Sequence, residues 1–281
     1  MSRSAIAGSI WRPLRGIDAH RLRDARQQVH QAVQWLARAA RAYLQPRADD
    51  GHTSLGWDDS LNGFVTHPMP GGMQLCLCVP SLTLTWGDRK DVVPLSLGGH
   101  TDGRVRQWIG EQVAKQGLDA NALDAPAPYT LTLNATYDAM ALSGALAELA
   151  VWFANADVSL GRLRAHLEDR RLDVSEVRCW PHHFDLATLI SFPARGGETG
   201  YVGAGLSPGD GYYDEPYFYI SAHPRPDPAT LPKLPALGHW HTHEFTAAVA
   251  PAHKILAREN REAATDDFLK EAVDYGIKVL K

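Results

Sequence analysis

Six of the thirteen histidines in this 281-residue chain lie between Trp180 and Glu244, among acidic and aromatic residues. Imidazoles, carboxylates and phenols are side chains that exchange protons or bind divalent cations in proteins. Three short segments hold them: Trp180–Asp185 (WPHHFD), Ser207–Tyr219 (SPGDGYYDEPYFY) and Gly238–Glu244 (GHWHTHE). This concentration predicts a functional site, although it does not name a reaction.

The alternation of side chains along a strand assigns these residues to faces. Strand parity, meaning odd or even position along a strand, predicts three polar sets that each share one face: His183 with Asp185; Glu215 with Tyr217 and Tyr219; and His239 with His241 and His243. If the three strands are neighbours in one sheet, the three sets form a single concave patch. His241 is then the most central residue, because it has a histidine on each side.

Each set has a candidate role. A carboxylate can orient an imidazole for general base catalysis, so His183 and Asp185 are predicted catalytic residues, with Glu215 as a second carboxylate. A purely structural hydrogen-bonded pair is the alternative for His183 and Asp185. Residues predicted to bind a ligand are Tyr217, Tyr219 and Asp210. For Asp210, the alternative is a turn that its carboxylate caps.

The His-Trp-His-Thr-His segment is the strongest signal for a metal. Residues two apart on a strand project side by side, and imidazole nitrogens bind zinc at about 2.0–2.1 Å. A carboxylate such as Asp185 or Glu215 would complete a site for a divalent metal such as zinc or iron. The predicted metal ligands are His239, His241 and His243. The alternative is that these imidazoles bond to backbone groups and acids.

Composition narrows the class of protein. The chain has 28 basic and 32 acidic residues, so its charge gives no electrostatic case for binding nucleic acid. No apolar run is long enough to predict a membrane-spanning helix or a secretory signal. Three cysteines are too few for a disulfide scaffold and favour the reducing cytoplasm. Cys76 and Cys78 share a strand face and are expected to be buried, unreactive thiols.

Apolar residues recur every three or four positions over residues 18–44, which predicts a long helix with Asp18 as its N-cap. His20 and His30 lie off the main apolar stripe of this helix and are therefore expected at the surface.

The remaining patterns predict an α+β fold with two strand-rich regions of mainly antiparallel sheet, packed by long helices. Residues 1–16 are expected to form a flexible arm, and residues 17–281 a single compact domain with halves at 17–125 and 126–281. The order helix–strands–helix occurs twice, so an internal duplication is one interpretation. Further helices are predicted over 102–116 and 137–155 and from Asn260, and strands over 73–79, 82–86, 92–97 and 129–134.

Several segments together resemble an uncharacterised group of bacterial proteins within a broader family of unknown function. The resemblance rests on three motifs: WPHHFDLAT (Trp180–Thr188), GLSPGDG (Gly205–Gly211) and EPYFY (Glu215–Tyr219). It implies that these segments and a closing helix belong to one recurring module. It implies no activity.

The leading hypothesis is a bacterial cytoplasmic enzyme that acts on a small polar metabolite through a pocket of His, Asp, Glu and Tyr. The first alternative is a non-catalytic module that holds a small ligand in the same pocket. The second is a structural protein that binds a partner chain. The oligomeric state and the identity of any metal stay open at this point.

Overall fold

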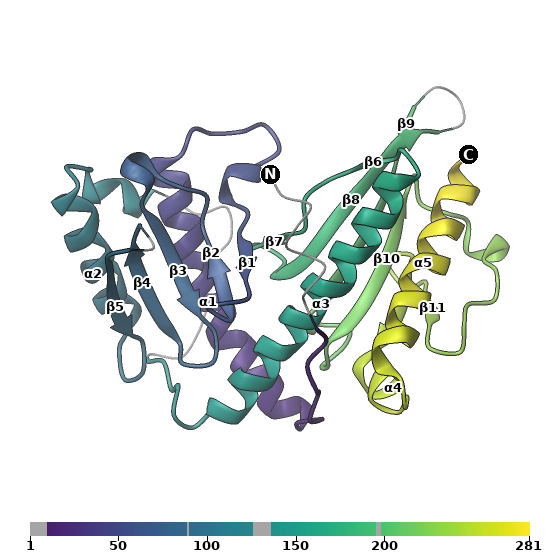
Figure 1. The fold of residues 1–281 in the computed structure, drawn as a ribbon, viewed down its shortest axis with the longest axis horizontal. Coiled ribbons are helices and arrows are strands. Elements are labelled where there is room, and N and C mark those ends of the chain that lie inside the picture. The colour runs from purple at the N-terminus through teal and green to yellow at the C-terminus, as the bar shows by residue number, and fades with distance from the viewer. Residues whose placement is uncertain (1–9, 89, 126–135, 195–197) are drawn as a thin grey trace. The chain divides into compact units, whose positions relative to one another are not determined.

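The computed structural model describes residues 10–88, 90–125, 136–194 and 198–281, and it has the predicted α+β fold with two antiparallel sheets (Figure 1). The described helices are α1 (Ala19–Tyr43), α2 (Asp102–Lys115), α3 (Ser143–Asp169), α4 (Ala252–Leu256) and α5 (Arg261–Leu280). The described strands are β1 (Gly56–Asp58), β2 (Gly63–Val65), β3 (Gln74–Cys78), β4 (Thr83–Gly87), β5 (Val92–Ser96), β6 (Asp173–Val174), β7 (Arg178–Trp180), β8 (Asp185–Pro193), β9 (Thr199–Ser207), β10 (Tyr217–His223), β11 (His239–His241) and β12 (Ala247–Pro251).

The chain divides into two compact units. The N-terminal unit comprises Ile17–Val151 and Cys179–Phe184, and the C-terminal unit comprises Met1–Gly16, Trp152–Arg178 and Asp185–Lys281. The chain passes between them four times: after Gly16, within α3, within β7 and immediately before β8. None of these crossings is near residue 125, where the sequence suggested a boundary. Within the described residues, no helix has the length and apolar character needed to cross a membrane.

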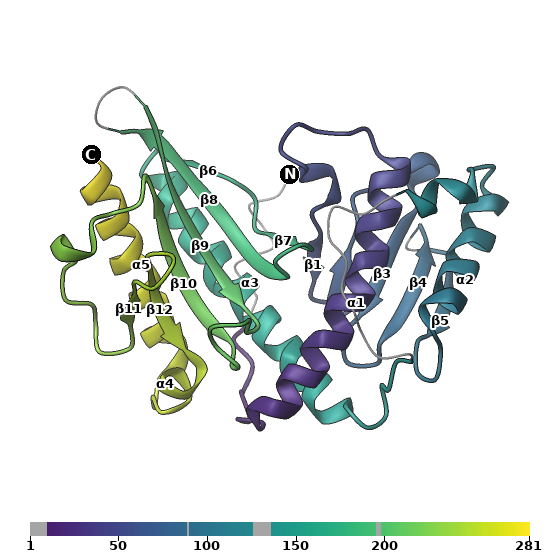
Figure 2. The ribbon, with the colours of Figure 1, turned by 180° about the vertical axis from the view of Figure 1, so that it is seen from behind.

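The N-terminal unit is built on a five-stranded sheet in the order β1-β2-β3-β4-β5, with α1 packed against one face (Figure 2). The predicted cap of α1 is confirmed, because the Asp18 carboxylate accepts the backbone N–H of His20 at 3.0 Å. The apolar stripe of α1 is buried, as are Leu75 and Leu77 of β3. Burial of these faces supplies the main driving force for the packing.

Asp102, the first residue of α2, ties three parts of this unit together. Its Oδ1 accepts hydrogen bonds from Trp35 Nε1 and from the Tyr137 hydroxyl, both at 2.9 Å. Its Oδ2 accepts from Gln31 Nε2 of α1. Burial and the adjacent carboxylate raise the pKa of Tyr137, so this phenol stays protonated as a donor.

The segment Cys179–Phe184 is held against α1 by polar side chains. Pro181 O accepts from Gln34 Nε2 at 2.7 Å and from His30 Nε2 at 2.8 Å. The His30 ring also stacks on Phe184 with ring centroids 5.0 Å apart. The prediction that His30 lies on the solvated surface is therefore wrong, because this returning segment covers it.

The larger sheet, in the C-terminal unit, places its strands in the order β11-β12-β10-β9-β8-β6, with each neighbouring pair antiparallel. Helix α5 and the part of α3 from Trp152 onward lie side by side over one face (Figure 1). That face is apolar and fully buried at Leu186, Ile190, Val202, Leu206 and Phe218. The two sheets have different strand orders, so the internal duplication is not confirmed.

Residues 11–14 do not form the flexible arm predicted from the sequence. Trp11 Nε1 donates to Ser159 Oγ at 3.0 Å, and the Arg12 backbone exchanges two hydrogen bonds with the Asn155 side chain. These contacts fix the segment on α3. The polar composition of residues 1–16 concealed the two anchoring groups.

The predicted packing of long helices is confirmed at α3, since Leu146, Leu149 and Trp152 are at most 1% exposed. The helix begins later than predicted, because Asp138 Oδ1 accepts the Ala141 backbone N–H and closes a turn first. The strand predicted over residues 129–134 lies outside the described residues. The three cysteines are free thiols, with Cys179 buried and Cys76 and Cys78 half-buried.

His30 should make the protein sensitive to acid. Burial, chiefly, lowers the pKa of His30 from 6.5 to about 4. The unfolded chain therefore binds more protons than the folded chain between these values, and stability falls as the pH falls through this window. This shift corresponds to roughly 3 kcal/mol in total. His30→Gln keeps a donor for Pro181 O but does not titrate, so urea unfolding at pH 7, 5.5 and 4 should show a shallower loss. Equal losses in both proteins would contradict the assignment.

Candidate functional site

The three polar segments of the sequence are not neighbouring strands. In the larger sheet β9 lies between β8 and β10, and β12 lies between β10 and β11. Alternate strands are roughly 10 Å apart, at about 4.8 Å per strand. The expected direct contact across neighbouring strands is therefore wrong. Contact across the sheet requires long side chains that pass over small residues on the strands between.

Tyr219 makes such a contact. It pairs with Gly205 of β9, and its hydroxyl passes over this glycine to donate to Asp185 Oδ2 on β8. A Cβ at Gly205 would lie 2.7 Å from the Tyr219 hydroxyl oxygen, so only glycine leaves the path open. Burial, with the carboxylate beside it, raises the pKa of Tyr219 well above its usual value. The phenol therefore remains protonated and supplies a donor to Oδ2 of the buried Asp185.

Asp210 organises the turn between β9 and β10. Its Oδ1 accepts the backbone N–H groups of Tyr212 at 2.8 Å and Tyr213 at 3.0 Å. Its Oδ2 accepts the Tyr217 hydroxyl at 2.6 Å. The alternative interpretation of Asp210, as the cap of a turn, is thus confirmed. The turn it forms fixes the direction of the Tyr213 side chain.

Tyr213 lies between two histidines of β11. Its hydroxyl is 3.0 Å from His239 Nε2 and 3.0 Å from His241 Nδ1. His241 Nε2 lies 2.6 Å from the His243 carbonyl, which can only accept a hydrogen bond. In a neutral His241, Nε2 therefore carries the proton and Nδ1 accepts from Tyr213. Tyr213 in turn accepts from His239 Nε2–H.

This assignment leaves the lone pair of His239 on Nδ1. That atom is buried and has no hydrogen-bond partner among the described residues. Burial lowers the pKa of His239, and the nearby positive charge of Lys254 and the imidazoles of His241 and His253 lower it further. Burial also raises the pKa of Tyr213. Both groups are thus held in their neutral forms near pH 7.

Aromatic rings and an arginine fix His241. Its ring stacks on Phe245 with centroids 4.1 Å apart and meets the edge of Tyr212 at 5.3 Å. Arg225 holds the turn that follows β11, donating to Thr246 Oγ1 at 2.7 Å and to two backbone carbonyls of the same turn. The imidazole therefore has a defined position although β11 is short.

His243 is not on the face predicted for it. Strand β11 ends at His241, and His243 lies in a bend before Glu244, whose φ is 62°. Strand parity therefore does not apply to His243, and its carbonyl, not its imidazole, is the group that meets His241. Tyr212 donates its hydroxyl to the Glu244 carboxylate across this bend.

Two predicted catalytic residues also lie elsewhere. Glu215 precedes β10, and its carboxylate accepts the backbone N–H of His253 at 2.7 Å and faces His253 Nδ1 at 2.6 Å. It caps the start of α4. His183 lies in a turn of the N-terminal unit and Asp185 begins β8 of the C-terminal unit, so the two do not share a strand. The φ of 58° at Phe184 breaks the alternation between them.

The histidines do not form the predicted metal centre in this arrangement. Both nitrogens of His241 are engaged, and no group of three or more His, Cys, Asp or Glu side chains among the described residues could hold a metal ion. No family model matches the chain, and comparisons with curated proteins and with solved structures found no match. The family resemblance therefore stays a prediction.

Sequence reasoning missed four residues of the site. Tyr213, Phe245 and Arg225 position the histidines of β11, and Gly205 leaves room for Tyr219. Tyr213 stands beside the predicted Asp210, and its place in a capped turn was a usable signal. Arg225 lies in a proline-rich run, and nothing local in the sequence predicts that its side chain holds the turn after β11. Gly205 is one of three small residues in a Gly-Ala-Gly run, which favours close approach of another side chain.

Gly205→Ala tests the crossing of Tyr219 over β9. The added methyl group would displace the Tyr219 ring and break its hydrogen bond to Asp185. We expect a loss of about 1–3 kcal/mol in the free energy of unfolding, measured by urea denaturation. Gly211→Ala is the matched control, because a Cβ there meets no atom within 4 Å. In Gly205→Ala/Tyr219→Leu the two effects should not add, and strict additivity would contradict the contact.

Proposed function

We propose that the C-terminal unit is an enzyme that transfers protons to or from a small polar metabolite at the His239–Tyr213–His241 cluster. The observation that carries this proposal is the Tyr213 hydroxyl, placed 3.0 Å from a nitrogen of each imidazole. A hydroxyl between two neutral imidazoles links them into one hydrogen-bonded chain. Such a chain can accept a proton at one end and hold it at the other.

The steps balance. A ligand gives its proton to His239 Nδ1, and His239 passes its Nε2 proton to the Tyr213 oxygen. Tyr213 passes its own proton to His241 Nδ1, which leaves an imidazolium whose Nε2–H is still bonded to the His243 carbonyl. The tyrosine ends neutral, so no phenolate accumulates. His239 Nδ1 is buried, and a ligand therefore enters by moving side chains beside the edge strand β11.

The polar groups around the cluster support binding of a ligand beside this base. Tyr217 and Asp210 are joined to each other, and the Tyr213 and Tyr217 rings lie 4.8 Å apart. The raised pKa of Tyr217, caused mainly by burial, keeps its hydroxyl protonated. Because this proton is donated to Asp210, the Tyr217 oxygen can still accept a hydrogen bond from a hydroxyl of the metabolite without competing for the transferred proton.

Tyr213→Phe tests the relay without removing an aromatic ring. A pool of small polar metabolites incubated with the protein in D₂O should show deuterium incorporation in the substrate by mass spectrometry. Loss of the hydroxyl should slow incorporation by about 10²-fold, the scale of general acid–base catalysis. Tyr201→Phe, on β9, is the matched control, since the Tyr201 hydroxyl has no hydrogen bond to a described residue.

The outcomes separate the classes of function. His241→Ala should abolish both turnover and ligand binding while circular dichroism shows an intact fold. A ligand that stabilises the protein thermally but never exchanges deuterium would favour a non-catalytic binding module. If Tyr213→Phe and Tyr201→Phe exchange at the same rate, the relay does not act.

Elemental analysis of the purified protein tests the metal expectation separately. Zinc or iron at one equivalent, lost in His239→Gln but kept in Tyr201→Phe, would assign a metal to the same imidazoles. A metal there would have to displace Tyr213 from His239 or His241. We expect no stoichiometric metal, because His239 Nδ1 alone among the four imidazole nitrogens of the cluster has no hydrogen bond to a described residue, and one nitrogen does not hold a divalent ion.

A further inference from the structure

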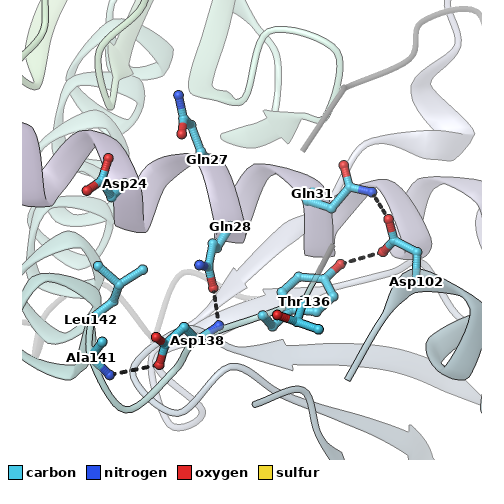
Figure 3. A pocket seen from close by; sticks show the side chains of 10 residues that line it. Asp24, Gln27, Gln28, Gln31, Asp102, Thr136, Asp138, Ala141 and Leu142 are labelled. Carbon is cyan, nitrogen blue, oxygen red and sulfur yellow. Dashed lines mark hydrogen bonds between the residues drawn. The ribbon is translucent and has the colours of Figure 1, made fainter. Parts of the chain in front are cut away.

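A separate cavity of about 310 Å³ lies in the N-terminal unit, between α1 and the segment that leads into α3. This volume corresponds to roughly ten water molecules and is at the lower end of ligand pockets. Asp24, Gln27, Gln28 and Gln31 of α1 line it, and the side chains of Gln28 and Gln31 extend toward Asp138 and Asp102 (Figure 3). The spacing of four and three residues places Asp24, Gln28 and Gln31 next to one another along the helix.

The other walls of the cavity are held in place by hydrogen bonds. Gln28 Oε1 accepts the backbone N–H of Asp138 at 2.8 Å, and Gln31 Nε2 donates to Asp102 (Figure 3). Asp102 also receives the Tyr137 hydroxyl, which lines the same cavity. These bonds fix the positions of the polar groups before any ligand arrives, which reduces the entropy lost on binding.

The atoms that remain open to a ligand are mainly acceptors. Asp138 uses Oδ1 to cap Ala141, and its Oδ2 has no hydrogen bond to a described residue. Gln31 Oε1 is buried and also has no partner in the described part of the chain. Asp24 is exposed, and its nearest cation, Arg23, is 4.0 Å away.

Among the described residues, the lining includes three carboxylates and no lysine, arginine or histidine. Arg21, the other neighbouring cation, is engaged with the Ala141 carbonyl at 2.6 Å. The three acids are spread along the wall, and they are not part of any group in the described chain that could hold a metal ion. An extended ligand with several donors and a positive charge would complement these acceptors.

We propose that this cavity binds a compact organic cation, namely an ammonium group on a small carbon skeleton that carries further hydroxyl or amine donors. The ammonium group lies between Asp24 and Asp138 at the mouth. The other donors reach Gln31 Oε1 and the open side of the Asp102 carboxylate. Gln27 and Gln28 supply amide groups that accept or donate to the same ligand.

Three matched pairs of probes test the charge requirement with the ¹⁵N-labelled full chain: Tris against pentaerythritol, glucosamine against glucose, and putrescine against 1,4-butanediol. We expect at least one cation to bind saturably at one site and to shift the side-chain amide signals of Gln27 and Gln28. Its uncharged counterpart should bind at least about tenfold more weakly, because charge-assisted hydrogen bonds are stronger than neutral ones.

Asp24→Asn should weaken binding of the cation by about tenfold, the scale of one lost charge-assisted contact. Asp91→Asn is the matched control, since it removes one exposed carboxylate of the same unit that does not line the cavity. Circular dichroism checks that both variants keep the fold. Failure of all three cations to bind saturably would overturn the proposal. So would equal binding of the uncharged probes, or unchanged binding in Asp24→Asn.

Discussion

The polar face of the larger sheet depends on one constraint: a buried carboxylate must receive a donor, and the donor must cross a strand to reach it. Asp185 is buried on β8, whereas Tyr219 projects from β10, one strand beyond the nearest neighbour. The hydroxyl reaches the carboxylate only because Gly205, on the intervening strand, has no side chain to block its path. A buried acceptor left without a partner would cost about 1–3 kcal/mol, which makes this glycine a determinant of stability.

The histidine cluster is also assembled by hydrogen bonds from charged side chains, in this case mainly to backbone groups. Its members come from a turn and from a short edge strand, neither of which is rigid by itself. Asp210 fixes the turn through two backbone N–H groups, and Arg225 fixes the bend after β11 through three acceptors. Asp210 therefore holds the backbone at Tyr213, and Arg225 holds the backbone that follows His241. The aromatic ring of Phe245 then restricts the imidazole in the remaining direction.

Local signals in the sequence predicted most of the helices and the apolar faces. Asp18 and Asn260 cap α1 and α5 as predicted, because a cap depends on residues only a few positions away. Within β8, Leu186 and Ile190 lie on the same face of the strand, as alternation requires, and both are buried. Parity failed just outside the strands, at Phe184 and Glu244, where a positive φ ends the regular alternation.

Strand order could not be predicted from the sequence, because it is determined by contacts between residues far apart in the chain. Nothing in the local pattern places β12 between β10 and β11, although β11 comes first along the chain. The same limit applied to His30, whose covering segment lies about 150 positions later. The types of residue in the candidate site were therefore predictable, whereas the pairs they form were not.

The two polar sites differ in the kinds of polar group that they offer, and this difference suits them to different tasks. In the cavity beside α1 the open atoms are carboxylate and amide oxygens, which favour a charged donor. In the cluster on β11, burial lowers the pKa of His239 and raises that of Tyr213. Proton transfer along a hydrogen-bonded chain requires each member to be neutral before the proton arrives. Burial meets that requirement at both residues at once, because it disfavours the charged imidazole and the charged phenolate alike.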